Sequence, residues 1–276
     1  MNISRFVVLW VCGLALLAGC KEETLVISPE EMLILGQGES IQLQTNVEAS
    51  FRLINDRGGS ISAEGLFTAG DSSGVFTVEA TSTRNANNQA SMLIRVSNRA
   101  DIIKDVLDGG HVIYMRHAIA RVGKDLFDDG PDGWHLSCNT DTARQLSPEG
   151  IVQAQELGEV WRELGLPLED TLYTSEFCRC IQTVEYLAYD QPMKTVPAVT
   201  FWVYNEFGRH DDTKAFIDQF PVTDKNHLVV SHSFGPGSDY PQVEQGYTAI
   251  FTGGQSGPTF LTIVRDDEWL ALKAPE

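Results

Sequence analysis

Two arginines and two histidines follow short apolar segments between residues 111 and 232. Arg116 and His117 end the first of these segments. Arg179 opens the helix predicted after the second, and His232 ends the third. Guanidinium groups bind phosphate through paired hydrogen bonds, and a helix that begins after Ser175 adds backbone N–H donors. Because a neutral imidazole among such groups can attack phosphorus, these residue types indicate phosphoryl transfer through a phosphohistidine.

The segments around these side chains alternate between strand and helix patterns. Buried strands are predicted at residues 111–115, 171–174 and 227–231, and helices at 148–164, 178–189 and 211–220. Ser147 is a favourable N-cap, and Pro148 suits a first helical position. The alternation predicts an α/β fold, a mostly parallel sheet with helices on both faces. Ligands of such sheets bind at the carboxyl ends of the strands, where the arginines and histidines lie.

The preceding residues, from Thr24 to about Asn98, have a different pattern. Short segments of alternating polar and apolar residues, such as 40–44 and 74–80, are separated by Gly, Asn, Asp and Ser. This pattern is typical of a small all-β sandwich. Residues 24–98 contain no His, Cys or Trp, and no catalytic set is evident there. We interpret the segment as a spacer, with ligand binding through its loops as the alternative.

Composition excludes several classes of protein. The 276 residues include 20 Lys and Arg against 38 Asp and Glu, a formal net charge of -18. A chain this acidic has no positive field to attract nucleic acid, so no nucleic-acid partner is expected. One long apolar stretch, at the N-terminus, argues against a polytopic membrane protein.

The N-terminus has the features of an exported lipoprotein. An apolar run from Phe6 to Leu17 suits a signal peptide and is short for a membrane span. It ends in Ala18-Gly19-Cys20, which resembles a bacterial lipobox with Cys20 as the lipidated residue. A plain signal peptide with a chance cysteine is the alternative. The predicted organisation is a signal peptide at 1–19, an all-β domain at 20–98 and an α/β domain at 99–276.

Both domains resemble known families. Residues 108–276 resemble the histidine phosphatase superfamily, the phosphoglycerate-mutase-like proteins. The matching segments are Met115-Arg116-His117-Ala118, Arg144 to Gly150, Thr174 to Thr183, and Val229 to His232. Ala118 and Ser231 stand where many members have Gly. Residues 20–98 resemble a bacterial immunoglobulin-like domain, chiefly at Ile61 to Gly70.

The resemblance implies a role for each residue of the site. His117 is the expected nucleophile, with Arg116, Arg179 and His232 holding the phosphoryl oxygens and His232 protonated. The chemistry needs no metal and no cofactor. A carboxylate must protonate the leaving oxygen and later activate water.

The general acid is identified by its position. One branch of the family places it directly after the second histidine, but Ser233 stands there. The other branch has it in a loop some 25–30 residues after the second arginine, and Glu206 fits this spacing. We therefore assign Glu206, with Asp239 or Glu244 as alternatives.

Three cysteines remain beyond the predicted lipid anchor. A Cys138–Cys178 disulfide would brace the phosphate site, because Cys178 adjoins Arg179. Cys138–Cys180 pairing or three buried thiols are the alternatives. The acidic loop from Asp125 to Asp132 is interpreted as a rim or lid rather than a metal site. His135 and His210 are candidates for the rim of the pocket.

The sequence thus predicts a membrane-anchored phosphatase of the bacterial cell envelope, periplasmic or surface-facing. It would hydrolyse a phosphomonoester, and its partners would be that substrate and the membrane, through lipidated Cys20. Sugar phosphates, lipopolysaccharide phosphates, nucleotides and phosphoproteins are all possible substrates. The alternative is an adhesion or ligand-binding lipoprotein whose phosphatase-like domain is inactive.

Overall fold

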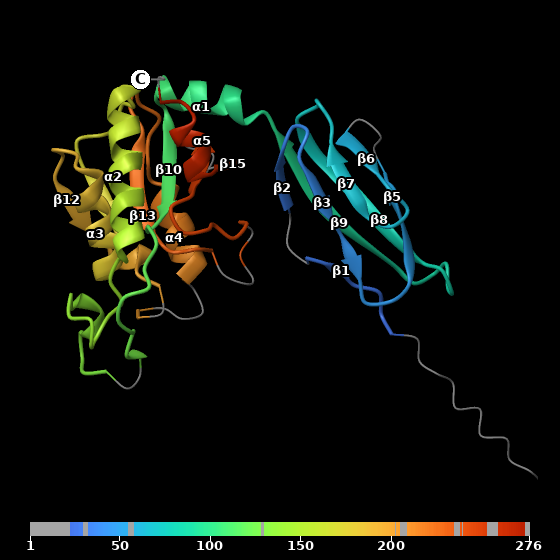
Figure 1. The fold of residues 1–276 in the computed structure, drawn as a ribbon, viewed down its shortest axis with the longest axis horizontal. Coiled ribbons are helices and arrows are strands. Elements are labelled where there is room, and N and C mark those ends of the chain that lie inside the picture. The colour runs from blue at the N-terminus through green and yellow to red at the C-terminus, as the bar shows by residue number, and fades with distance from the viewer. Residues whose placement is uncertain are drawn as a thin grey trace, which may run out of the picture.

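The computed structural model shows two modules, one all-β and one α/β, joined through helix α1 (Arg99–Leu107) (Figure 1). The structure describes residues 23–29, 33–54, 58–127, 130–201, 203–204, 209–234, 238, 240–252 and 259–273. The predicted signal peptide and Cys20 lie outside these ranges. No helix in the described ranges is both long and apolar enough to span a membrane.

The α/β module is built on one six-stranded sheet. Its order is β12 (Met193–Thr195), β11 (Leu172–Thr174), β13 (His227–Ser231), β10 (His111–Arg116), β14 (Thr248–Thr252) and β15 (Phe260–Val264). The first four strands pair in parallel, and β14 and β15 join antiparallel. The three strands predicted from the sequence are therefore confirmed, and they lie side by side at the centre of the sheet.

Helices cover both faces of this sheet, as predicted. They are α1, α2 (Pro148–Glu163), α3 (Cys178–Leu187), α4 (Arg209–Ile217) and α5 (Asp266–Leu270), with short 3-10 turns at Trp134–Leu136 and Pro197–Val199. Alternate residues of β10 face opposite sides. Ile113 packs in the cluster that contains Trp161 of α2, whereas Val112 packs in the cluster that contains Ile217 of α4. Helices α1, α2, α3 and α5 thus share one face, and α4 covers the other.

Helix α2 is fixed against the residues that follow β10. The Ser147 hydroxyl accepts a 3.3 Å hydrogen bond from the backbone N–H of Gly150, and Pro148 occupies the first turn, as predicted. A Cβ atom at Gly150 would collide with the carbonyl of Ile119. The side chain of Gln153, one turn later, accepts from the N–H of Ile119 at 3.1 Å. The helix therefore holds the chain just beyond His117.

The N-terminal module consists of short strands in three sheets. The strands are β1 (Ile27–Ser28), β2 (Leu33–Gly36), β3 (Ser40–Gln42), β4 (Gln44–Thr45), β5 (Ala49–Leu53), β6 (Gly59–Ile61), β7 (Leu66–Ala69), β8 (Gly74–Ser82) and β9 (Gln89–Ser97). Their sheet orders are β2-β9-β8-β5, β3-β7-β6 and β1-β4. Phe67 of β7 and Ile94 of β9 are both fully buried in one core, so the two larger sheets pack on each other.

The two modules contact each other at the edge strand β15. The Ser97 and Thr262 hydroxyls lie 2.8 Å apart, and both are buried. Glu39 accepts from Arg99 at 2.8 Å and from Arg265 at 3.0 Å. Since β14 separates β15 from β10, the all-β module covers the edge of the sheet and leaves β10 and β13 to the site described next.

Candidate active site

Parallel pairing of β10 with β13 brings the two sequence-predicted histidines together. Arg116 is the register partner of Ser231, so the residue after each strand lies at the same edge of the sheet. The backbone N–H of His117 donates to the Ser231 carbonyl at 2.9 Å. The ring centroids of His117 and His232 are 5.5 Å apart.

Two hydrogen bonds fix the orientation and the tautomer of the His117 ring. Its Nδ1 lies 2.8 Å from the carbonyl oxygen of Ala118, and its Nε2 lies 3.2 Å from Nε of Arg179. A carbonyl oxygen can only accept and a guanidinium N–H can only donate, which places the ring proton on Nδ1 and a lone pair on Nε2. Burial, together with Arg179, Arg116 and Arg144, holds the pKa of His117 well below its usual value, although the Ala118 carbonyl opposes this. The ring is therefore neutral, as a nucleophile must be.

Arg179 lies in the first turn of α3 and is buried. Besides contacting His117, its guanidinium lies 4.2 Å above the ring of Phe177. Thr183, one turn later, donates to the Arg179 carbonyl at 2.7 Å and accepts from the N–H of Ala118 at 3.0 Å. This hydroxyl couples the helix that carries Arg179 to the loop that carries His117.

His232 is buried among polar and aromatic partners. Its Nε2 lies 3.0 Å from the Ser175 hydroxyl, and Tyr114 donates to its carbonyl oxygen at 3.0 Å. Burial, then Arg179 and His117, hold the pKa of His232 well below its usual value. His232 is therefore neutral in the free protein, because burial and nearby positive charge oppose a further proton, and its predicted protonation concerns the phosphate-bound state.

The Arg116 side chain contacts the segment that follows His232. Its Nη1 donates to the Val243 carbonyl at 2.9 Å, and its Nη1 lies 3.8 Å from the carboxylate of Glu244. Its Nε is buried and has no hydrogen-bond partner among the described residues. A phosphoryl oxygen would supply the acceptor that this donor needs.

Asp125 and Arg144 complete the site, and neither was among the assigned site residues. Asp125 accepts from Arg179 at 3.0 Å and from Arg144 at 2.7 Å, and its side chain is 2% exposed. Within the acidic loop that was interpreted as a rim or lid, Asp125 is therefore a buried partner of two arginines. Burial opposes its charge, but Arg179 and Arg144 lower the pKa of Asp125, which stays ionised. We call Arg116, His117, Arg144, Arg179 and His232 the cationic site.

A disulfide between Cys138 and Cys178 adjoins the cationic site, with the Cα atoms 5.2 Å apart. This is the first of the pairings considered from the sequence. Cys180 is a free, buried thiol whose Sγ lies 3.7 Å from Nε2 of His232. Burial raises the pKa of Cys180 to about 12, so this thiol stays protonated.

The remaining predicted residues have different outcomes. Glu206 and Asp239 lie outside the described residues. Glu244 is described; its side chain is 72% exposed and faces Arg116. His135 is buried with Nε2 3.3 Å from the Tyr204 hydroxyl, and the His210 ring lies 5.7 Å from Phe201. Within the described ranges, no three His, Cys, Asp or Glu side chains converge as metal ligands would.

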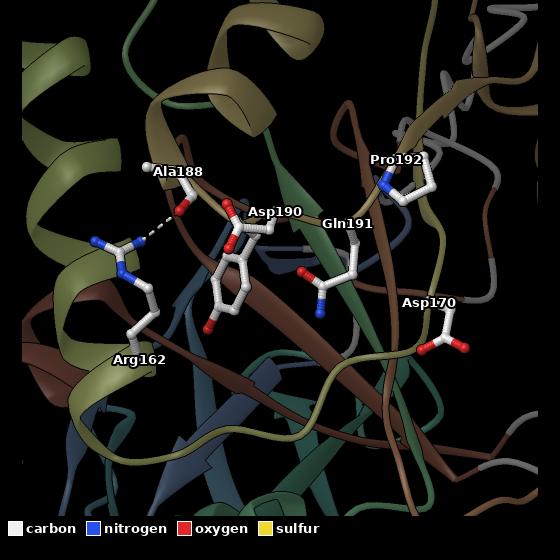
Figure 2. A pocket seen from close by; sticks show the side chains of 7 residues that line it. Arg162, Asp170, Ala188, Asp190, Gln191 and Pro192 are labelled. Carbon is white, nitrogen blue, oxygen red and sulfur yellow. Dashed lines mark hydrogen bonds between the residues drawn. The ribbon is translucent and has the colours of Figure 1, made fainter.

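A pocket of about 520 Å³ lies near the amino ends of β11 and β12 (Figure 2). Asp170 and Pro192, on its wall, precede β11 and β12, whereas the cationic site follows the carboxyl ends of the strands. Arg162 points to the carbonyl of Ala188 and donates to it at 3.2 Å (Figure 2). Asp170 pairs with Lys225 at 2.7 Å. These charges are engaged within the protein, and the pocket shows no catalytic arrangement.

Comparison with known proteins gives distant structural similarity. No protein-family model and no curated protein matches the chain. It is similar to the protein histidine phosphatase SixA complexed with tungstate, at 18% identity and a TM-score of 0.40, over 57% of this chain and 97% of that one. It is also similar to the alpha-ribazole phosphatase from Shigella flexneri, at 16% identity and a TM-score of 0.35, over 56% of this chain and 96% of that one. A third similar structure is a mycobacterial glucosyl-3-phosphoglycerate phosphatase in complex with inorganic phosphate. It shares 10% identity with this chain at a TM-score of 0.39, over 59% of this chain and 99% of that one.

Proposed function

We propose that the α/β module is a phosphomonoester phosphatase with His117 as its covalent nucleophile. The observation that carries this proposal is the environment of the His117 ring. The Ala118 carbonyl fixes its proton on Nδ1, and the lone pair of Nε2 lies beside the guanidinium of Arg179. Burial keeps the ring neutral. A nucleophile with a fixed lone pair next to phosphate-binding groups is the arrangement that in-line phosphoryl transfer requires.

In the first step, the Nε–H of Arg179 turns from Nε2 of His117 to a phosphoryl oxygen, and the released Nε2 lone pair forms a bond to phosphorus while the bond to the leaving oxygen breaks. Arg179 and the buried Nε of Arg116, which has no partner among the described residues, would stabilise the phosphoryl oxygens. His232 is neutral before substrate binds, and a phosphate dianion beside it raises its pKa and favours protonation. Glu206 is our candidate for the acid that protonates the leaving oxygen.

In the second step, water attacks phosphorus and the P–N bond breaks. Glu206, now a carboxylate, accepts the proton from that water, and inorganic phosphate leaves. Arg116, Arg144 and Arg179, joined by His232 once it is protonated and offset by Asp125, hold the phosphate charge in both steps. No step requires a metal ion or a cofactor.

The proposal extends to the location of the protein. We propose that lipidation of Cys20 anchors the chain to a membrane of the bacterial cell envelope and that the all-β module, an immunoglobulin-like spacer, separates the catalytic module from that membrane. The lipobox-like sequence before Cys20 supports this. Detergent-phase partitioning tests it: wild type should enter the detergent phase and Cys20→Ala the aqueous phase. Wild type in the aqueous phase contradicts anchoring.

The catalytic proposal is tested by trapping the phosphoenzyme. Wild type incubated with a phosphomonoester and quenched in base should carry an acid-labile phosphate, and His117→Ala should carry none and lose activity by several orders of magnitude. His111→Gln, at the opposite end of the same strand, is the control and should behave as wild type. Turnover by His117→Ala contradicts the assignment. Absence of turnover by wild type on every phosphomonoester favours the inactive binding lipoprotein.

A further inference from the structure

An aromatic cluster extends from the cationic site to the protein surface. Its members share ring contacts and lie on the loop before α2, at the start of α3 and near α4. We call it the aromatic rim, and it consists of Phe127, Trp134, His135, Phe177 and Tyr204.

The contacts of the aromatic rim form two paths from one buried ring. Phe177 lies 5.0 Å from His232 and beneath the guanidinium of Arg179. From Phe177, one path runs through Trp134 to Phe127, with centroids 5.4 Å apart at each step. The other runs through His135 to Tyr204, at 6.1 Å and 5.6 Å. The catalytic groups are thus connected to two outer rings by continuous aromatic packing.

The two outer rings are exposed to solvent. Phe127 is 51% exposed and Tyr204 is 54% exposed. Exposed aromatic side chains that connect through packed rings to a set of charged groups present an apolar surface for a ligand.

The backbone of Phe127 is held in an unfavourable conformation. Its φ is +48°, in the left-handed region that bulky side chains rarely adopt. Two hydrogen bonds fix this turn: Leu126 donates to the Thr142 carbonyl at 3.2 Å, and Gly130 donates to the Phe127 carbonyl at 3.0 Å. Strain of this kind persists where surrounding structure enforces it and is common at ligand-binding sites. The exposed Phe127 ring lies on the loop that also carries Asp125.

The charges near the aromatic rim disfavour a second anionic group on the substrate. Asp125 pairs with Arg144 and Arg179. These two arginines therefore offer fewer donors to a second anionic group once the phosphate is bound. Burial and then the Glu176 carboxylate raise the pKa of Tyr204 to about 12, so a second carboxylate lies near the rim. The wider chain carries a net charge of -18.

We propose that the aromatic rim binds the leaving group, and that the substrate is a phosphomonoester of a planar, uncharged aromatic compound. This inference rests on the proposed phosphatase function. The cationic site takes the phosphate, and the outer rings Phe127 and Tyr204 pack against the plane of the leaving group. Aromatic contacts of this kind are each worth about 0.5–1.5 kcal/mol, or about 2- to 12-fold in affinity.

Two matched substrates test the proposal. Phenyl and 2-naphthyl phosphate release similar phenols, so a difference between them reports ring contact rather than leaving-group chemistry. Wild type should have a kcat/KM about 5-fold or more higher for 2-naphthyl phosphate. Phe127→Ala and Tyr204→Ala should each reduce this ratio toward one, whereas Tyr204→Phe, which keeps the ring, should retain it. Leu272→Ala, at an exposed apolar position near the C-terminal helix, is the control and should also retain it.

Inhibition by phosphonates gives a second measurement that is independent of turnover. Naphthylmethylphosphonate should inhibit wild type more strongly than methylphosphonate, and the difference should shrink in Phe127→Ala and Tyr204→Ala. Equal ratios in wild type and both alanine variants would overturn the aromatic preference and leave the phosphatase intact. Failure of wild type to hydrolyse either phosphate would overturn the phosphatase proposal itself.

Discussion

Nη1 of Arg179 donates to Oδ1 of Asp125 over 3.0 Å, and both side chains are almost fully buried. The same carboxylate accepts from Nε of Arg144 and from its backbone N–H, at 2.7 and 3.0 Å. Asp125 therefore fixes the direction of the guanidinium that contacts His117. Because it occupies donors that phosphate would also use, Asp125 orients the site and also limits its affinity for anions.

Asp125→Asn should separate these two effects. Loss of the charge leaves a buried arginine without its partner, and breaking such a pair costs about 3–5 kcal/mol of stability. We expect kcat to fall about 10- to 100-fold as Arg179 loses its alignment, while KM does not rise, because a carboxylate no longer repels the phosphate. Steady-state kinetics measure kcat and KM, and thermal unfolding measures the loss of stability. Asp132→Asn, at an exposed position of the same loop, is the control; a loss confined to KM would contradict the orienting role.

The two histidines of the site predict how stability depends on pH. Burial and the arginines lower the pKa of both His117 and His232 below the ordinary value of 6.5. Above pH 6.5 the folded and unfolded chains both hold these rings neutral, and the histidines contribute nothing. Below pH 6.5 the unfolded chain binds protons that the folded chain does not, so stability falls.

The expected slope is about 1.4 kcal/mol per pH unit for each histidine. Denaturant unfolding between pH 7.5 and 5 should show it, and His232→Asn should reduce it. Inorganic phosphate should reduce it as well, because the bound anion favours the protonated ring. A free energy of unfolding that is flat from pH 6.5 to 5 would show that these rings titrate normally in the folded protein.

The strand-end residues could be predicted because their position depends on local pattern and one topological rule. Parallel strands align their carboxyl ends, so Arg116, His117 and His232 had to meet. Asp125 could not be placed in this way. Its loop has no periodic pattern, and long-range hydrogen bonds such as Lys124 N–H to the Thr140 carbonyl, at 3.2 Å, determine where it lies.

Local pattern also failed at the end of helix α3. The predicted helix continued to Tyr189, but the helix ends at Leu187, where Ala188 adopts a φ of +54°. Arg162 of α2 donates to the carbonyls of Leu187 and Ala188. A cap supplied by another helix leaves no mark in the sequence around Ala188, so periodicity extends the helix too far.

Removing the disulfide should affect both stability and activity. Cys138 and Cys178 are 40 residues apart, and closing a loop of that length is worth about 4 kcal/mol by the chain-entropy estimate. The bond also ties the loop that carries Arg144 to the first turn of α3. We expect Cys138→Ser/Cys178→Ser to unfold at lower temperature and to lose kcat. Dithiothreitol should reproduce this in wild type and have no effect on the double variant; full activity of the reduced enzyme would contradict the coupling.

Glu206→Gln should impair substrates in proportion to the basicity of their leaving group. An alkyl phosphate releases a strongly basic alkoxide and depends on a proton, whereas p-nitrophenolate leaves without one. General acid catalysis contributes about 10²- to 10⁴-fold, so the gap between the two substrates should approach that range. The second step still lacks its base, and a burst of p-nitrophenol should appear as phosphoenzyme accumulates. Single-turnover kinetics on both substrates measure this.

Glu244→Gln is the comparison, because Glu244 is largely exposed and faces Arg116. Equal losses on both substrates without a burst would move the role to Asp239 or Glu244.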